Sequence, residues 1–160
     1  MIVEQLNQLF FSDQLGRRLD ERLIKVWNNI RHDRDGVPLK QDFFQQYIGD
    51  MWPFLFVIEV GSQVGLAVVE RIGEALTSGM DKDYDGKSLV EIPEKSVLYH
   101  ATRNYDVALL KKGAVSAAGE FVNRKGDIVL YRSTLLPVTK EPRKITTIIG
   151  AASYRVQIVI

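Results

Sequence analysis

FVNRKGDIVLYRSTLLPV, residues 121–138, is the stretch that decides the fold. Two runs in it alternate between apolar and polar side chains and are rich in Val, Ile, Thr and Tyr, as strands are. The NRKG sequence between them is a short basic turn, in which Gly126 supplies the backbone freedom that a tight turn needs. The stretch therefore predicts a β-hairpin.

Strand-like sequence continues on both sides of this hairpin. AVSAAGEFV, residues 114–122, runs into its first strand, and KITTIIGAASYRVQIVI, residues 144–160, follows it after a short polar connection. Three consecutive strands with short connections predict an antiparallel meander. Further upstream, PFLFVIEV, residues 53–60, has the composition of a buried strand with Pro at its first position.

Apolar residues at helical spacing occupy most of the remaining chain. The most regular stripe lies between Leu15 and Ile30, and residues 2–10 predict a shorter amphipathic segment before it. The spacing from Gly65 to Ser78 predicts another helix. A stripe over residues 97–108 predicts one more, with Pro93 in its first turn. Helices, one strand, helices and three strands predict an α+β domain with helices covering one face of a sheet.

Length and composition limit the possible function classes. The 160 residues fit one domain, with residues 1–40 predicted as a helical extension and residues 41–160 as one compact unit. The formal net charge of +1 gives no strong field toward nucleic acid, and the absence of cysteine excludes disulfides and thiolate chemistry. No stretch has the pattern of a secretory signal or a membrane span. We therefore expect a cytoplasmic protein that binds no nucleic acid and has no membrane span.

From Leu15 to Arg155 the chain resembles a PAS domain. GEFVNRKGDIVLYRSTLLPV followed by ITTIIGAASYR is similar to the long-stranded hairpin and final strand of that family. Upstream, LIKVWNNIRHDRDGVPLKQDF, WPFLFVIEV and QVGLAVVERIGEALT resemble one bacterial branch of it. The resemblance implies a PAS-like antiparallel sheet with helices on one face, preceded by N-terminal helices. It also implies a sensory or regulatory role.

Two features depart from the family pattern. The family places a first hairpin after the strand that ends near Val60, whereas here only GSQVG precedes the next predicted helix. We therefore expect the second strand to be nearly absent, which leaves one wall of a family-type pocket without its strand. The other departure is DKDYDG, residues 81–86, an acidic insertion.

The acidic insertion resembles a calcium-binding loop. Asp81, Asp83 and Asp85 occupy the first, third and fifth places of such a loop. The twelfth place should hold a bidentate Glu but holds Ile92, and Glu91 comes one residue early. An ordinary surface turn is the favoured interpretation, with calcium binding as the alternative.

Three side chains are candidate ligand contacts: Tyr99, His100 and Tyr131. His100 lies on the helix that some PAS sensors use to hold haem, so the resemblance implies haem as one alternative. A histidine at the core edge that hydrogen-bonds a neighbour is the other. Because strand side chains alternate, Tyr131 and Arg132 are predicted to point to opposite faces. If Tyr131 faces the helices, it either lines a small-ligand pocket or packs in the core.

These observations favour a non-catalytic module. No serine has a Gly-flanked elbow, and neither histidine has a carboxylate pattern that would make it a base. We expect a protein that acts on a signalling partner or as a homodimer; the cofactor is open, with none expected. A ligand or haem sensor, a calcium-binding protein and a small α+β enzyme are the alternatives. The apolar tail, Val156 and residues 158–160, predicts cover by the N-terminal helix or by a second subunit.

Overall fold

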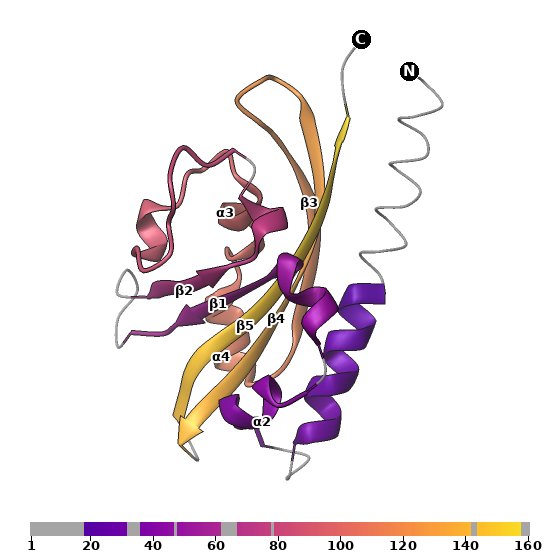
Figure 1. Cartoon of the computed structure of the whole chain (residues 1–160), viewed down its shortest axis with the longest axis vertical. Coiled ribbons are helices and arrows are strands. Elements are labelled where there is room, and N and C mark those ends of the chain that lie inside the picture. Colours follow the sequence, from indigo (N-terminus) through magenta and orange to yellow (C-terminus); the bar gives the residue numbers. More distant parts are fainter. Residues whose placement is uncertain are drawn as a thin grey trace.

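The centre of the protein is a five-stranded antiparallel sheet. The computed structural model describes residues 18–31, 36–46, 48–61, 67–77, 79–141 and 144–157. The strands lie in the order β2-β1-β5-β4-β3 (Figure 1). Their bounds are β1 Leu55–Glu59, β2 Val68–Ile72, β3 Val115–Val122, β4 Ile128–Glu141 and β5 Lys144–Gln157. With helices packed on this sheet, the α+β fold class is confirmed.

The predicted meander is present in the second half of the chain. Strand β4 pairs with β3 on one side and with β5 on the other, both antiparallel. In the turn between β3 and β4, the Asn123 side chain accepts hydrogen bonds from the N–H groups of Lys125 (3.0 Å) and Asp127 (2.9 Å). Gly126 has a φ of 85°, a conformation that glycine adopts without strain. The NRKG sequence therefore forms the tight turn that its residues predict.

The expectation for residues 65–78 was wrong. Val68–Ile72 is strand β2, which pairs antiparallel with β1, and only Glu74–Leu76 forms a short 3-10 helix, η2. Val69 is fully buried and Glu70 is exposed, the alternation of a strand at a sheet edge. A Cβ on Gly73 would lie 2.3 Å from the carbonyl oxygen of Pro53, so the strand must end at a glycine here. The family's first hairpin is thus present, and the second strand is not missing.

The predicted helix over residues 97–108 is two helices. α3 (Val97–Ala101) and α4 (Tyr105–Lys111) are separated by a turn. The Thr102 hydroxyl donates a 2.8 Å hydrogen bond to the Leu98 carbonyl at the end of α3, a local bond that competes with further helix. Ser96 caps α3 by accepting from the Tyr99 N–H, so Pro93 precedes the helix and is not in its first turn.

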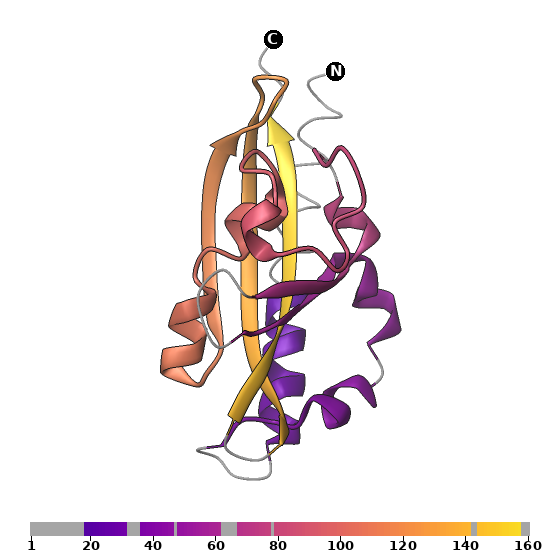
Figure 2. The same ribbon diagram turned by 90° about the vertical axis from the view of Figure 1, so that its left-hand side faces the viewer.

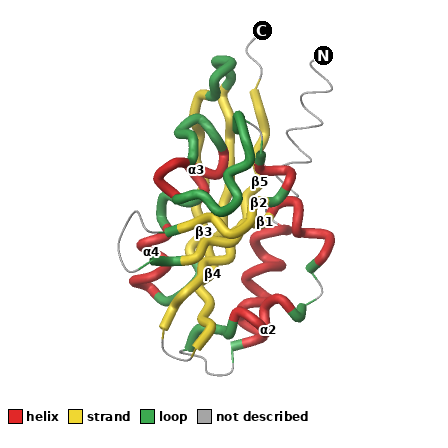
Figure 3. The backbone as a smooth tube through the Cα atoms, turned by 60° about the vertical axis from the view of Figure 1, so that its left-hand side comes forward, coloured by secondary structure: helices red, strands yellow, loops and turns green. Residues whose placement is uncertain are grey.

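The N-terminal helix covers the other face of the sheet. Residues 18–30 are helical, and they pack with α2 (Lys40–Phe44) and the 3-10 helix η1 (Gly49–Phe54). Pro53 belongs to η1, so β1 begins two residues later than predicted. Figures 2 and 3 show α3 and the N-terminal helix on opposite sides of the long strands. We call the α3 side the inner face and the other side the outer face.

Each face has its own apolar layer. Because side chains alternate along a strand, one strand contributes to both layers. In β1, Phe56 points to the inner layer and Leu55 to the outer one, and both are fully buried. Helix residues Leu19, Leu23 and Trp27 complete the outer layer. The division of the chain at residue 40 stays a prediction, and residues 2–10 and 158–160 lie outside the described residues. In the part of the chain that the structure describes, no helix is long and apolar enough to cross a membrane.

Candidate functional site

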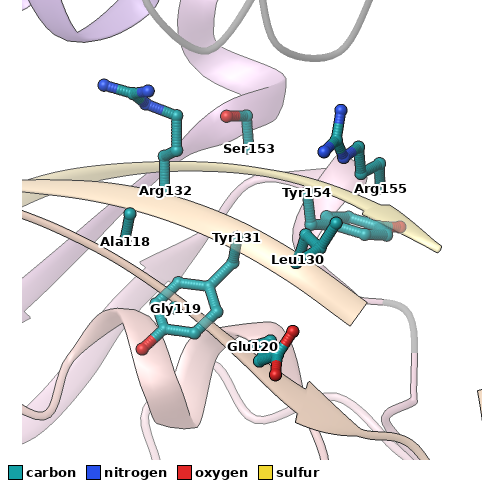
Figure 4. A pocket seen from close by; sticks show the side chains of 9 residues that line it. All are labelled: Ala118, Gly119, Glu120, Leu130, Tyr131, Arg132, Ser153, Tyr154 and Arg155. Carbon is teal, nitrogen blue, oxygen red and sulfur yellow. The ribbon is translucent and has the colours of Figure 1, made fainter. Parts of the chain in front are cut away.

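The outer face has an open hollow beyond the end of its apolar layer. The hollow has a volume of about 420 Å³ and lies over the parts of β3, β4 and β5 that extend beyond the described helix residues 18–30 (Figure 1). The strand register places Glu120, Leu130 and Arg155 side by side in one row across this face. The next row is Ala118, Arg132 and Ser153. In Figure 4 Arg132, Ser153 and Arg155 all stand on the side opposite to Tyr131.

A buried acid joins the N-terminal helix to the edge of this hollow. Asp20 is 6% exposed, and one of its oxygens lies 3.5 Å from Nε of Arg132. Burial raises the pKa of Asp20, although hydrogen bonds from Thr134 and Arg132 act in the opposite direction. A buried acid of this kind is what the enzyme alternative requires. Asp20 does not line the hollow, however, and its partners hold it against β4, so its position is that of a helix anchor.

The three predicted ligand residues come together on the inner face. The ring centres of Tyr99 and His100 are 5.1 Å apart, and those of His100 and Tyr131 are 5.7 Å apart. Phe121, which the sequence did not single out, stacks on His100 at 4.2 Å. The predicted opposite directions of Tyr131 and Arg132 are confirmed (Figure 4). The Tyr131 ring lies where a side chain on Gly119 would stand, with its hydroxyl 2.8 Å from an ideal Cβ there.

His100 is held by its own backbone surroundings. Its Nε2 lies 2.9 Å from the Glu94 carbonyl oxygen, and because a carbonyl only accepts, Nε2 carries the proton and donates. Burial lowers the pKa of His100, against the effect of this hydrogen bond. The neutral imidazole stacks on Phe121, and His100 thus has the features of a histidine at the edge of the core that hydrogen-bonds a neighbour. A ligand role for Tyr99, His100 and Tyr131 stays a prediction.

The acidic segment 81–86 uses its carboxylates locally. Each carboxylate accepts a hydrogen bond from a group nearby in the fold: Asp81 from the Tyr84 hydroxyl, Asp83 from the Asp85 N–H, Asp85 from the Ile72 N–H, and Glu91 from the Ser88 N–H. Such bonds are typical of turns and of a helix N-terminus. Among the described residues no three His, Asp or Glu side chains are grouped so that they could hold a metal ion.

A second hollow opens at the far end of the inner face, and the sequence did not predict it. Its volume is about 440 Å³, and it lies between the tip of the β3–β4 hairpin and the segments that precede α3. Its lining includes Lys95, Arg124 and Lys125. The basic NRKG turn was the available signal, but a basic turn is most simply interpreted as a solvated one. We call this site the inner hollow, and the first one the outer hollow.

Comparisons with known proteins assign no family to the chain. No protein-family model and no curated protein sequence matches the chain. A LOV domain of a blue-light-activated histidine kinase from Erythrobacter litoralis is similar in structure, with 14% identity, 66% of this chain and 98% of that chain covered, and a TM-score of 0.46. A fungal LOV-domain photoreceptor follows at 13% identity, 65% and 74% coverage and a TM-score of 0.41.

A third similar structure is the GABA-bound ligand-binding domain of an amino acid chemoreceptor from Pseudomonas aeruginosa. Its identity is 16%, the coverage is 94% of this chain and 55% of that one, and the TM-score is 0.34. The fold itself rests on the elements of this chain: a first hairpin, helices, a long-stranded hairpin and a final strand, all in one antiparallel sheet. These are the elements that the sequence resemblance implied, and the chain has a PAS-type fold.

Proposed function

We propose that the chain is a non-catalytic sensory or regulatory module of the PAS type, which acts in the cytoplasm through protein contact. The observation that carries the proposal is the outer hollow, where the apolar layer that the described residues form on the outer face stops before the sheet does. Beyond that layer, the outer face continues with Leu130, Ile128 and the 54% exposed Val122. Leu130 and Ile128 are partly buried and Val122 is exposed, and apolar side chains in such positions on a strand pair at a sheet edge are typical of an interaction surface.

The occupant that this surface fits best is a second copy of the chain. In the row Glu120, Leu130 and Arg155, an acid and a base flank a central leucine. A two-fold axis along β4 would place Leu130 against its own copy and Glu120 against Arg155 of the other copy. The ion pair between Glu120 and Arg155 would form twice in such an interface, because a two-fold axis makes every contact between the copies occur twice. A guanidinium has five N–H donors, so Arg155 can hold this partner together with others.

Leu130→Glu tests the proposed interface. Two glutamates would then face each other at its centre, and we expect self-association to weaken roughly a hundredfold, because opposed like charges cost several kcal/mol. Sedimentation velocity at several protein concentrations measures the effect. The control is Leu110→Glu, on α4, where an 85% exposed leucine lies away from the outer face and dimerisation should not change.

Two other results would contradict a dimer through the outer hollow. A wild-type protein that stays monomeric at every concentration would contradict self-association. A chain that lacks residues 1–14 should still dimerise. If this deletion abolishes the dimer and Leu130→Glu does not, the N-terminal segment forms the interface and the outer hollow does not.

A further inference from the structure

The inner hollow has an apolar floor. Val97 and Val129 line it and are 3% exposed each. Phe121, Tyr154 and Val156 also line it; they pack on the inner apolar layer but are only partly buried. The inner layer is therefore not closed at this end of the sheet. Apolar surface that a small molecule could cover remains in contact with water.

The rim of the inner hollow is basic. Lys95, Arg124 and Lys125 are exposed members of its lining, and Asp127 is the one acid among the described lining residues. Among the described residues, no ion pair joins any of these three cations to a carboxylate. Asp81 is a further acid near Arg124. The hydrogen bond from Tyr84 lowers its pKa, and the charge of Arg124 acts in the same direction. The three cations of the lining therefore outnumber the two acids Asp81 and Asp127.

The apolar floor and the basic rim together favour one chemical class of ligand. A volume of about 440 Å³ is within the range of small-molecule sites, which combine apolar walls with a few polar groups that orient the ligand. An apolar molecule without charge would leave the three cations unused, and an inorganic anion would leave the floor uncovered. We propose that the inner hollow binds a small amphipathic anion, a carboxylate or phosphate ester with a short apolar body. The body lies against Phe121 and Val156, and the head lies among Lys95, Arg124 and Lys125.

The aromatic group behind the hollow provides a direct readout of binding. Phe121 forms part of the floor, and its ring stacks on His100 at 4.2 Å. A ligand body against Phe121 changes the ring currents and packing that the imidazole experiences. The His100 ring resonances should therefore move on binding, together with the amide resonances of β3 and β5 beside the floor. This site does not depend on self-association through the outer face, so either proposal can fail without the other.

Binding is measured with probes that differ only in the head group. Octanoate and octyl phosphate should both bind in calorimetric titrations, and their relative affinity tells which head group the rim prefers. Octanol and octyltrimethylammonium should bind at least about tenfold more weakly, since they lack the charge-assisted hydrogen bonds. Acetate and inorganic phosphate, which lack the apolar body, should give no measurable heat. Equal binding of octanol and octanoate would overturn the proposal.

Two sets of variants locate the site. The triple variant Lys95→Ala, Arg124→Ala, Lys125→Ala should weaken octanoate binding about tenfold or more, because the head loses its cations. All three side chains are exposed, so the fold should not change. Lys25→Ala, an exposed lysine on the N-terminal helix, is the matched control and should bind as the wild type does. Unchanged octanoate binding in the triple variant would contradict the assignment.

The apolar side of the site is tested separately. Val156→Phe places a larger ring in the hollow and should weaken octanoate and octanol alike. If octanoate instead moves the amide resonances of Arg132 and Arg155 and leaves those around Phe121 and His100 in place, the anion binds in the outer hollow. That result would overturn the proposal for the inner one.

Discussion

Gly150→Ala is expected to lower the free energy of unfolding by about 3 kcal/mol, the upper part of the range for overpacked cores. Gly150 lies opposite Phe56 in the pairing of β5 with β1. The Phe56 ring covers it so closely that an ideal Cβ would lie 2.1 Å from the nearest ring atom. Phe56 is fully buried among the side chains of the inner layer, so a shift of its ring would have to be accommodated by these neighbours.

Chemical denaturation at one fixed protein concentration measures this effect, because self-association would itself add stability. Gly49→Ala is the matched control: a Cβ there meets nothing within 4 Å, and the change should be within about 0.5 kcal/mol. Phe56→Leu in the Gly150→Ala background should recover part of the loss, since the smaller side chain makes room for the methyl group. A Gly150→Ala protein as stable as the Gly49→Ala control would contradict the described packing of β1 on β5.

Trp27→Ala is expected to lower the free energy of unfolding by about 4 kcal/mol, as large-to-small changes of buried tryptophan do. Trp27 is 3% exposed and lies in the outer layer with Leu136 and Ile149 of the sheet. Its Nε1 donates a 2.8 Å hydrogen bond to the Pro137 carbonyl of β4, and this carbonyl would lose its partner. The guanidinium of Arg31 also lies over the Trp27 ring, at 4.7 Å from its centre.

Trp27→Phe separates the two contributions. It keeps most of the apolar contact but removes the N–H donor, so its loss should be clearly smaller than that of Trp27→Ala. If the N-terminal helix and the sheet form one cooperative unit, each protein should unfold in one transition, and Trp27→Ala should move that transition to a lower denaturant concentration. If the sheet unfolds at the same denaturant concentration in both proteins, residues 1–40 behave as the separate extension that the sequence predicts, and the outer layer contributes little to the sheet.

Local pattern was enough to predict the second half of the fold. β3 alternates residue by residue, β4 and β5 are long runs rich in Ile, Val, Leu and Thr, and the turn around Gly126 marks where the chain reverses. β2 was missed because its five residues include an exposed Glu70–Arg71 pair, and because Val68, Ile72 and Leu76 happen to recur at helical spacing. This segment is a strand because it pairs with β1. The spacing of apolar residues within the segment gives no information about that pairing.

The candidate sites depend even more on contacts across the chain. Alternation predicted that Tyr131 and Arg132 face opposite ways, but not that Arg132 would meet Asp20, more than a hundred positions earlier. The row that joins Glu120 to Arg155 exists only through the register of three strands. Single residues could therefore be assigned to faces from the sequence, whereas the sites, which combine separate segments, could not.

The most direct test of a regulatory module that acts through its outer face is an exchange of charges in that row. Glu120→Arg alone and Arg155→Glu alone each place like charges together across the proposed two-fold axis. Sedimentation velocity should show both single variants as monomers, while the double variant Glu120→Arg, Arg155→Glu restores both ion pairs and sediments as a dimer. Single variants that remain dimers, or a double variant that stays as monomeric as they are, would contradict the proposed interface.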